Sequence, residues 1–354
     1  MEQVLVGMSG GVDSSVTALI LMEQYRVSGG TMKLFDSGDI VTTGKTCCAI
    51  TDVEDARRVC HRLGLDHHVF NFTGEFYKEV MARFAKGYAK GETPNPCIDC
   101  NRFVKFPGLL RRGEQLGFPY VATGHYARIQ YDASTGRWQL RRAIDAGKDQ
   151  SYVLYAMTQE ELSRTLLPLG ERTKAEIRAM AETKGLVTAD KPDSQDICFV
   201  PNGDYATFLM EKMGLAARPG DILDKAGSVL GQHTGAIRYT IGQRRGLGVA
   251  APTPLYVIGK DMKKNTVIVG EQADLMQDRF HVRDANWISI PTLTEPCTAT
   301  VMTRYRDQEE AATLHPCPDG RVEVRLNAPK RAVTPGQAAV FYQGDIVVGG
   351  GVIC

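Results

Sequence analysis

Three cysteines are spaced in a way that suits either thiol chemistry or metal binding. Cys97 and Cys100 form a C-x-x-C pair in TPNPCIDCN (93–101), and Cys198 lies in DSQDICF (193–199). A cysteine becomes a nucleophile only as a thiolate, so its surroundings must lower its pKa. A single cysteine in an apolar context more often fills a core. On their own, these cysteines leave a zinc clip, a redox pair and a catalytic site open.

A glycine-rich loop, MSGGVDSS (8–15), follows the short apolar run VLVGM (4–8) and precedes a helical pattern. Two glycines permit a tight turn, and serine N–H groups next to a helix N-terminus can hold an anion. Asp13 is the predicted magnesium ligand, because Mg²⁺ prefers oxygen ligands. The loop lacks the G-x-x-x-x-G-K-[ST] pattern of the Walker motif. It therefore predicts a phosphate site of another kind.

Strand-like and helix-like segments alternate over the first 200 residues, which predicts a parallel sheet covered on both faces. Phosphate-binding loops in such folds lie at the carboxyl edge of the sheet. The expected helices are DVEDARRVCHRLG (52–64), EFYKEVMARFAKGYAKG (75–91) and TKAEIRAMAETKG (173–185), and the expected strands include HVFNF (68–72), YVATGHYARI (120–129) and RWQLRRA (137–143).

The character of the chain changes after about residue 205, where glycine and proline become frequent and long helical patterns end. From about residue 278, alternating strands bounded by turn residues are typical of a small antiparallel barrel. We therefore expect three domains: an α/β catalytic domain (1–204), a central β-rich domain (205–277) and a C-terminal β-barrel (278–354).

Composition places the chain among ordinary globular proteins, with 43% hydrophobic and 23% charged residues among 354. No apolar run is long enough to span a membrane, and no signal peptide opens the sequence, so we expect a cytoplasmic protein. Nine cysteines without dense spacing favour thiols over a disulfide scaffold. The net charge is +1, but segment 100–150 carries nine basic and four acidic side chains. That surplus fits either a solvated surface or a phosphate-facing patch.

The loop SGGVDS resembles the PP-loop of ATP pyrophosphatases, which cleave ATP to AMP and pyrophosphate. The whole chain resembles the tRNA-specific 2-thiouridylases. The shared motifs are GMSGGVDSS, TPNPCIDCN followed by VKF, ATGHYA, KDQSY, DSQDICFV, YTIGQRRGLG, the RYR at 304–306 and TPGQAAVFY (334–342). The resemblance implies a PP-loop domain of the adenine nucleotide alpha hydrolase-like fold, ATP with Mg²⁺, and two partners: the anticodon stem-loop of wobble-uridine tRNAs and a persulfide sulfur-donor protein.

The implied reaction is ATP-dependent 2-thiolation of the wobble uridine: the C2 oxygen is adenylated, and a Cys198 persulfide then supplies sulfur, with Cys100 as the partner thiol. The resemblance also implies binding residues. ATP phosphates would contact Gly7, Met8, Ser9, Gly10, Gly11, Val12, Asp13 and Ser14, with Met32 and Gly124 near the nucleoside. The target base would face Asn95, Pro96 and Cys97, and tRNA would contact His125, Lys148, Asp149, Gln150, Arg304, Tyr305 and Gln337. With tRNA as the substrate, the basic surplus in 100–150 would face phosphates.

Cys97 departs from the family pattern, because many relatives have aspartate at this position. Cysteine cannot accept the same hydrogen bonds, so the general-base or base-positioning role of that carboxylate does not transfer. Cys97, Cys100 and Cys198 would instead suit three corners of a [4Fe–4S] cluster, while zinc would need a fourth ligand. Two other functions remain open: an amide-forming PP-loop synthetase that does not act on RNA, and a non-catalytic RNA-binding protein with a metal clip.

Overall fold

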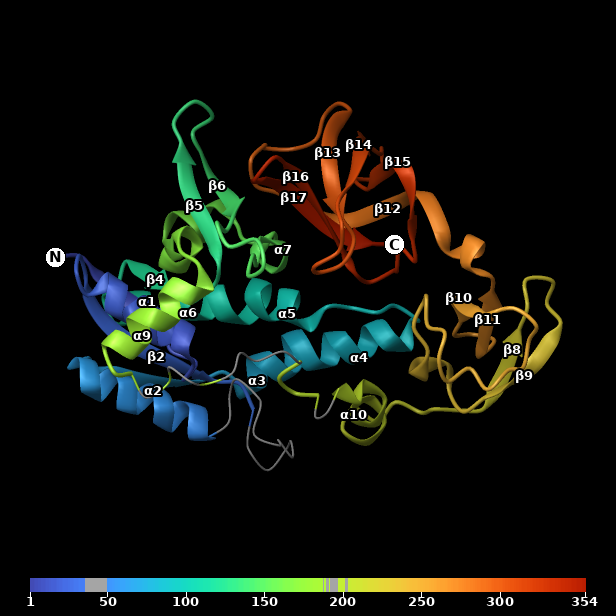
Figure 1. Ribbon diagram of the computed structural model, residues 1–354, viewed down its shortest axis with the longest axis horizontal. Coiled ribbons are helices and arrows are strands. Elements are labelled where there is room, and N and C mark those ends of the chain that lie inside the picture. Colours follow the sequence, from blue (N-terminus) through green and yellow to red (C-terminus); the bar gives the residue numbers. More distant parts are fainter. Residues whose placement is uncertain (36–49, 187, 189–190, 192–196, 201–202) are drawn as a thin grey trace.

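The computed structural model describes residues 1–35, 50–186, 188, 191, 197–200 and 203–354 (Figure 1). The DSQD part (193–196) of the 193–199 motif lies outside these residues. The N-terminal part is built on a five-stranded sheet of order β3-β2-β1-β4-β7. All its pairs are parallel, as predicted. The strands are β1 (Gln3–Gly7), β2 (Arg26–Lys33), β3 (His67–Asn71), β4 (Tyr120–Ala122) and β7 (Thr165–Leu166).

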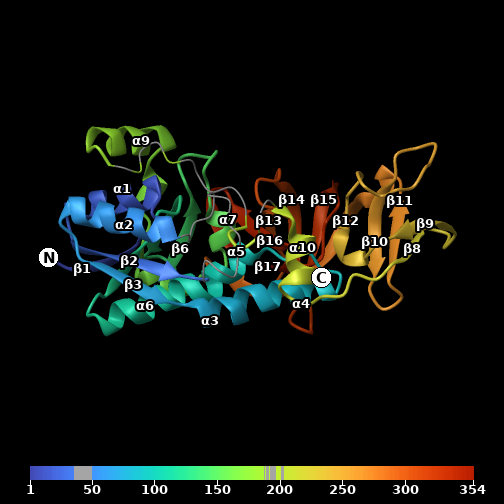
Figure 2. The same ribbon diagram turned by 90° about the horizontal axis from the view of Figure 1, so that it is seen from below.

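Helices cover both faces of this sheet (Figure 2). On β1, Val4 and Val6 pack with residues of α1 (Val12–Leu21) and α2 (Ile50–Leu63). Leu5, between them, packs with residues of α6 (Phe106–Gln115) on the other face. Alternate residues of a strand point to opposite faces, so a continuous apolar run is what a doubly covered strand requires. Helix α9 (Lys174–Thr183) lies beside α1 and begins with the predicted capping box.

The segment that carries the C-x-x-C pair is helical but irregular. Before it run α3 (Thr73–Phe76), the π-helix η1 (Tyr77–Met81) and α4 (Ala82–Ala89), which together form the predicted helix over 75–91. The pair itself lies on α5 (Pro96–Asp99) and on a second π-helix, η2 (Cys100–Lys105), which continues into α6. Wide π turns within helices occur frequently at functional sites.

One hairpin of the N-terminal part pairs with the C-terminal barrel. The predicted strand over 120–129 is split, because β4 ends at Ala122 and β5 (Ala127–Asp132) begins after the TGHY turn. β5 pairs with β6 (Arg137–Arg142), and Arg141 of β6 pairs with Ile346 of β17. The catalytic and barrel regions are therefore joined by a shared sheet.

The remaining chain forms two β structures. The central one is a four-stranded sheet, β10-β11-β8-β9, made of β8 (Gly220–Leu223), β9 (Val229–His233), β10 (Tyr256–Asp261) and β11 (Thr266–Gly270), and it follows α10 (Tyr205–Glu211). The C-terminal barrel closes because β12 pairs with both β15 and β17. Its strands are β12 (Met276–Trp287), β13 (Cys297–Met302), β14 (Glu310–Pro316), β15 (Val322–Arg331), β16 (Ala338–Gln343) and β17 (Ile346–Ile353).

Short elements complete the description: α7 (Ser151–Leu154), α8 (Gln159–Ser163) and the 3-10 turns η3 (Pro168–Glu171), η5 (Ala236–Arg238) and η6 (Gln272–Leu275). Within the described ranges, no helix has the length and apolar character needed to cross a bilayer. The predicted architecture, a parallel α/β domain followed by a small β-rich domain and an antiparallel barrel, is confirmed.

Candidate active site

The glycine loop lies between β1 and α1, at the carboxyl edge of the parallel sheet. Gly10 has φ +71°, and a Cβ there would lie 2.4 Å from the carbonyl oxygen of Asp52, so only glycine fits. The Ser14 hydroxyl accepts from the Ser9 N–H at 3.2 Å and donates to the Gly11 carbonyl at 3.1 Å. Gly11 has no side chain to cap α1, so the N–H groups of its first turn can face an anion.

Asp13, the predicted magnesium ligand, is held by two side chains of the protein. Its carboxylate accepts from Lys174 Nζ at 2.7 and 2.9 Å and from the Tyr126 hydroxyl at 2.7 Å. Lys174 is only 8% exposed and comes from the first turn of α9, where its N–H donates to Asp145 at 2.9 Å. The ammonium thus places a positive charge beside the loop. No motif in the sequence singles out Lys174, and the magnesium role of Asp13 stays a prediction.

The two residues predicted near the nucleoside lie on, or just after, the strands that flank β1. Gly124 follows β4 so closely against α1 that a Cβ would lie 2.9 Å from the Ser14 nitrogen. Met32 is near the end of β2, half-buried against the cluster that contains Leu5. Both therefore lie at the sheet edge where ligands bind in open α/β folds.

Lys191 connects the glycine loop to the chain segment that leads to Cys198. Its Nζ donates to the Gly10 carbonyl at 3.1 Å, to Asp52 at 2.5 Å and to Asp55 at 2.9 Å. Partial burial alone would lower the pKa of Lys191, but the hydrogen bonds to the two carboxylates outweigh it and raise the pKa. Lysine in DKPDSQD carries no motif signal by itself, so sequence analysis missed this contact.

The tertiary structure brings Cys100 and Cys198 to the same core. Both are half-buried and pack against an aromatic cluster that includes Phe76, Phe84 and Phe199. Phe199 contacts both other rings edge-on, with centroids 5.6 and 5.5 Å apart. Cys100 and Cys198 are far apart in the sequence, so only the folding of the chain brings them to the same core.

Cys97 differs from the other two cysteines in its exposure. It lies in the first turn of α5, and its N–H donates to the Asn95 side chain, the N-cap, at 3.1 Å. Cys97 is exposed, whereas Cys100 and Cys198 are half-buried. Among the described residues, no group of three or more His, Cys, Asp or Glu side chains is arranged to hold a metal ion. The three cysteines as placed do not form the donor set that a [4Fe–4S] cluster requires.

His125, a predicted tRNA contact, is held within the catalytic domain. Its Nε2 lies 3.4 Å from Lys105 Nζ, and its Nδ1 lies 2.7 Å from the Thr123 hydroxyl. Burial and the nearby Lys105 ammonium hold the pKa of His125 well below its usual range. The imidazole is therefore neutral at physiological pH, and Lys105 supplies the positive charge at this position.

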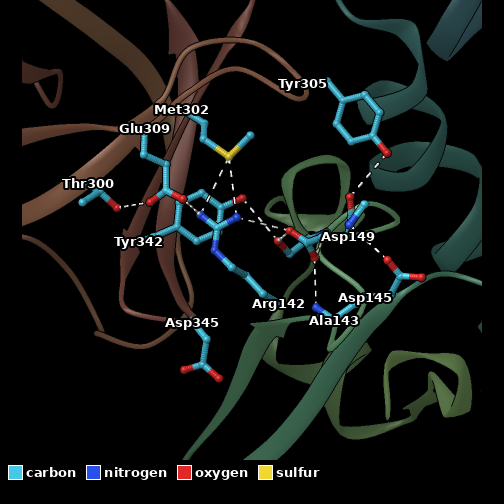
Figure 3. A network of polar contacts seen from close by, with 12 residues as sticks. Arg142, Ala143, Asp145, Asp149, Thr300, Met302, Tyr305, Glu309, Tyr342 and Asp345 are labelled. Atoms are coloured by element: carbon cyan, nitrogen blue, oxygen red, sulfur yellow. Dashed lines mark hydrogen bonds and ion pairs between the residues drawn. The ribbon is translucent and has the colours of Figure 1, made fainter. Parts of the chain in front are cut away.

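Among the predicted KDQ contacts (148–150), Asp149 is bonded on several sides (Figure 3). The Asp149 carboxylate accepts from the N–H groups of Ala143 and Ser151 at 3.0 and 3.2 Å and pairs with Arg142 at 3.3 Å. Gln150 accepts from the Tyr126 N–H at 2.9 Å through its side chain. Lys148, on the same turn, is half-buried.

The predicted tRNA contacts of the barrel also have partners in the chain. Arg304 donates to the Ala332 carbonyl at 2.6 Å, and the Tyr305 hydroxyl donates to the Asp149 carbonyl at 3.3 Å. The Gln337 side chain donates to the Thr93 carbonyl at 2.5 Å, just before the TPNP segment. Tyr305 and Gln337 therefore join the barrel to the catalytic domain, a role that sequence analysis did not anticipate.

Comparison with known proteins agrees with this arrangement. Three family models match: a tRNA methyl transferase HUP domain over residues 2–202, a tRNA methyl transferase PRC-barrel domain over 206–271 and an aminomethyltransferase beta-barrel domain over 277–353. The chain is 47% identical to the tRNA-specific 2-thiouridylase MnmA of Acetivibrio thermocellus, covering 99% of both chains. It is 50% identical to that of Heliobacterium modesticaldum, covering 99% of this chain and 92% of the relative.

The chain belongs to the tRNA-specific 2-thiouridylase family. Among solved structures, the NH3-dependent NAD synthetase of Campylobacter jejuni aligns at 17% identity and a TM-score of 0.33, over 55% of this chain and 69% of the synthetase. That alignment is too distant to bear on function. The family membership predicted from the motifs is confirmed by the relatives.

Proposed function

We propose that this 2-thiouridylase family member replaces the C2 oxygen of the wobble uridine in tRNA with sulfur at the expense of ATP. The observation that carries the proposal is that Cys100 and Cys198, far apart in sequence, pack against one aromatic core. Near-complete alignment with the tRNA-specific 2-thiouridylases supports it. A persulfide donor protein is the proposed source of sulfur.

The first step would take place at the glycine loop. The uridine O2 attacks the α-phosphorus of ATP, pyrophosphate leaves, and the C2 oxygen becomes part of an AMP leaving group. The first-turn N–H groups of α1 would hold the phosphates, and the Lys174 ammonium lies beside them on Asp13. Magnesium would enter with ATP and neutralise phosphate charge. At Asp13 it would share the carboxylate with Lys174 and Tyr126.

The second step would use the two half-buried cysteines. The terminal sulfur of a Cys198 persulfide attacks C2, and AMP leaves with the former O2. The Cys100 thiolate then attacks the Cys198 Sγ, so that the persulfide bond breaks, 2-thiouridine is released and a Cys100–Cys198 disulfide forms. A reductant and a new persulfide from the donor protein reset the site. We route the proposed transfer through these thiols alone, because the described cysteines are not arranged as a cluster donor set.

The test is the formation of 2-thiouridine in tRNA incubated with the protein, ATP, magnesium and a sulfide or persulfide source, with and without iron. Cys198→Ser and Cys100→Ser should each lower thiolation by at least about a thousandfold, the scale on which removal of a catalytic nucleophile acts. Pyrophosphate release should continue in Cys198→Ser, because adenylation precedes sulfur transfer. Cys297→Ser, a barrel cysteine, is the matched control and should keep full activity.

Cys97→Asp separates the two sulfur mechanisms. In the thiol relay this variant should retain thiolation, because aspartate restores the side chain of many relatives. Loss of activity in Cys97→Asp together with an iron requirement would replace the relay by a cluster. Thiolation that persists in Cys198→Ser would contradict the proposal itself.

A further inference from the structure

A cleft of about 270 Å³ lies where the catalytic helices meet the barrel. One wall comes from α4 and the residues that follow it, including Lys86 and Lys90, and from Arg102 on η2. The opposite wall comes from the barrel, with Arg283 of β12 and Gly336 before β16. Neither Cys97 nor Cys100 lines this cleft; Asn95 and Asp99 of the same helical segment do. The cleft therefore lies on another face of the segment that carries the two cysteines.

The charges of the cleft are not balanced. Five basic side chains and three acidic ones line it. Arg283 pairs with Glu92 at 3.1 Å and Asp284 at 2.8 Å, and Arg83 lies 3.5 Å from Asp99. These ion pairs involve all three acidic residues of the cleft, Glu92, Asp99 and Asp284.

The other three cations, Lys86, Lys90 and Arg102, form no ion pair with any described residue. The cleft therefore carries two more basic than acidic side chains, and such a surplus in a partly enclosed space attracts an anion.

The shape and position of the cleft indicate what kind of anion fits. Its volume is slightly below the range of about 300–1,000 Å³ typical of whole small-molecule sites. Arg83, Lys86 and Lys90 follow one another at helical spacing, so their charges extend over about 10 Å along α4. A row of charges suits an extended polyanion better than a single small ion. The cleft is also lined by Asn95, itself a predicted base-facing residue, and by Gly336, which adjoins the predicted tRNA contact Gln337.

We propose that this cleft binds backbone phosphates of the substrate RNA next to the target nucleotide, through Lys86, Lys90 and Arg102. The assignment rests on the proposed function, because it takes tRNA as the substrate. It adds a phosphate-binding surface on α4 and η2 to the contacts predicted from the motifs. Holding the backbone here would orient the nucleotide over the segment formed by α5 and η2, which carries Cys97 and Cys100.

The test compares a cleft variant with a matched charge control. The cleft variant is Lys86→Gln with Lys90→Gln. The control is Lys78→Gln with Lys184→Gln, two exposed lysines outside the cleft, the first of them on the same helical run. Binding of an anticodon stem-loop RNA is measured by fluorescence anisotropy over a range of salt concentrations, and ATP affinity is measured in parallel.

The cleft variant should bind the RNA at least about tenfold more weakly and reduce the salt slope by about 1.4, because each single-strand phosphate that is no longer neutralised lowers the slope by about 0.7. ATP affinity should not change, and the control should shift RNA affinity by less than about twofold. Unchanged RNA affinity in the cleft variant, or an equal decrease in the control, overturns the assignment.

Pyrophosphate serves as a second probe for a small-anion site. If it raises the melting temperature of the wild type but not of the cleft variant, while both bind RNA equally, the cleft holds a small anion and the RNA assignment fails. If the wild type thiolates tRNA and the cleft variant binds RNA as well as the wild type does, the cleft assignment is wrong but the proposed function stands. A wild type that neither binds nor thiolates tRNA would remove the proposed function as well.

Discussion

The junction between the catalytic domain and the barrel has two sides that differ in how their charges are used. On one side, Arg142 contacts Asp149 and Glu309, at 3.3 and 2.5 Å, and its guanidinium lies 3.7 Å from the centroid of the Tyr342 ring (Figure 3). On the other side, the cleft holds Lys86, Lys90 and Arg102 without carboxylate partners among the described residues. Charge that is balanced within the chain holds the domains together, whereas unbalanced charge is available to a ligand.

The difference between the two sides bears on the predicted tRNA contacts. The polar atoms of Asp149, Tyr305 and Gln337 already bond to other parts of the chain. A contact with RNA would have to share or replace these bonds. We therefore expect substitutions at these positions to affect the docking of the domains as well as any RNA contact.

Arg142→Ala should have the largest effect, because it leaves Asp149 and Glu309 without their cation. Removing one member of a buried pair costs about 3–5 kcal/mol. The Arg142 side chain is 22% exposed, so we expect the low end, about 3 kcal/mol. Urea unfolding followed by tryptophan fluorescence measures this loss of unfolding free energy. The two tryptophans of the chain, Trp138 and Trp287, both lie near the junction and report on it.

The control for this prediction is Arg325→Ala. Arg325 is half exposed and pairs with Glu323 of the same strand, so its removal should cost less than about 1 kcal/mol. Equal destabilisation of the two variants would mean that the Arg142 network does not hold the junction.

Gly336→Ala should have an intermediate effect on the cleft side. Gly336 has φ +90°, and a Cβ there would lie 2.7 Å from the Thr93 nitrogen. We expect destabilisation by about 2 kcal/mol from backbone strain and from separation of the cleft walls. Gly320→Ala is the matched control, because its φ is +80° but a Cβ would meet nothing within 4 Å. A thermal melt in which both variants lose equal stability would show that the close approach at Gly336 contributes nothing.

Asp99→Asn should have the smallest effect, and one that depends on pH. Burial raises the pKa of Asp99 to about 6, against the opposing influence of Arg83 and Arg102 and in the same direction as Glu79. An acid whose pKa is higher in the folded state binds its proton more tightly there, so wild-type stability falls as pH rises from about 4 to 6. Relative to Asp99→Asn, the wild type should lose about 1 kcal/mol of unfolding free energy between pH 5 and pH 7.

Asp319→Asn is the control, for which we expect stability to depend on pH in the opposite direction. Hydrogen bonds from Arg321 lower the pKa of Asp319, so the wild type should lose stability relative to this variant as the pH falls below about 4. Urea unfolding of all three proteins at several pH values makes the comparison. A pH-independent difference for Asp99→Asn would show that the carboxylate on the cleft side is solvated, and the contrast between the two sides would weaken.

Several elements could be predicted because their cause is local. Three predictions depend on neighbouring residues only, and each is confirmed. The apolar run VLVGM forms a strand, the glycines of SGGVDS form a tight turn, and Thr173 and Glu176 form the capping box. The alternating strands after residue 278 behave likewise and form the barrel. The split of the predicted strand at 120–129 was missed, because the TGHY turn is determined by the packing of Gly124 against α1 and by the Tyr126 contact with Asp13.

The sequence by itself determined the family, the glycine loop and the identity of the candidate reactive cysteines, because motif residues and turn glycines carry that information at short range. Only the tertiary structure placed Cys100 and Cys198 against one core, set Lys174 on Asp13 and Lys191 on Gly10, and left Lys86, Lys90 and Arg102 around a cleft. These arrangements join residues far apart in the chain. They depend on how helices and sheets pack and on which charges the folded chain balances, and neither is encoded in the spacing of any motif.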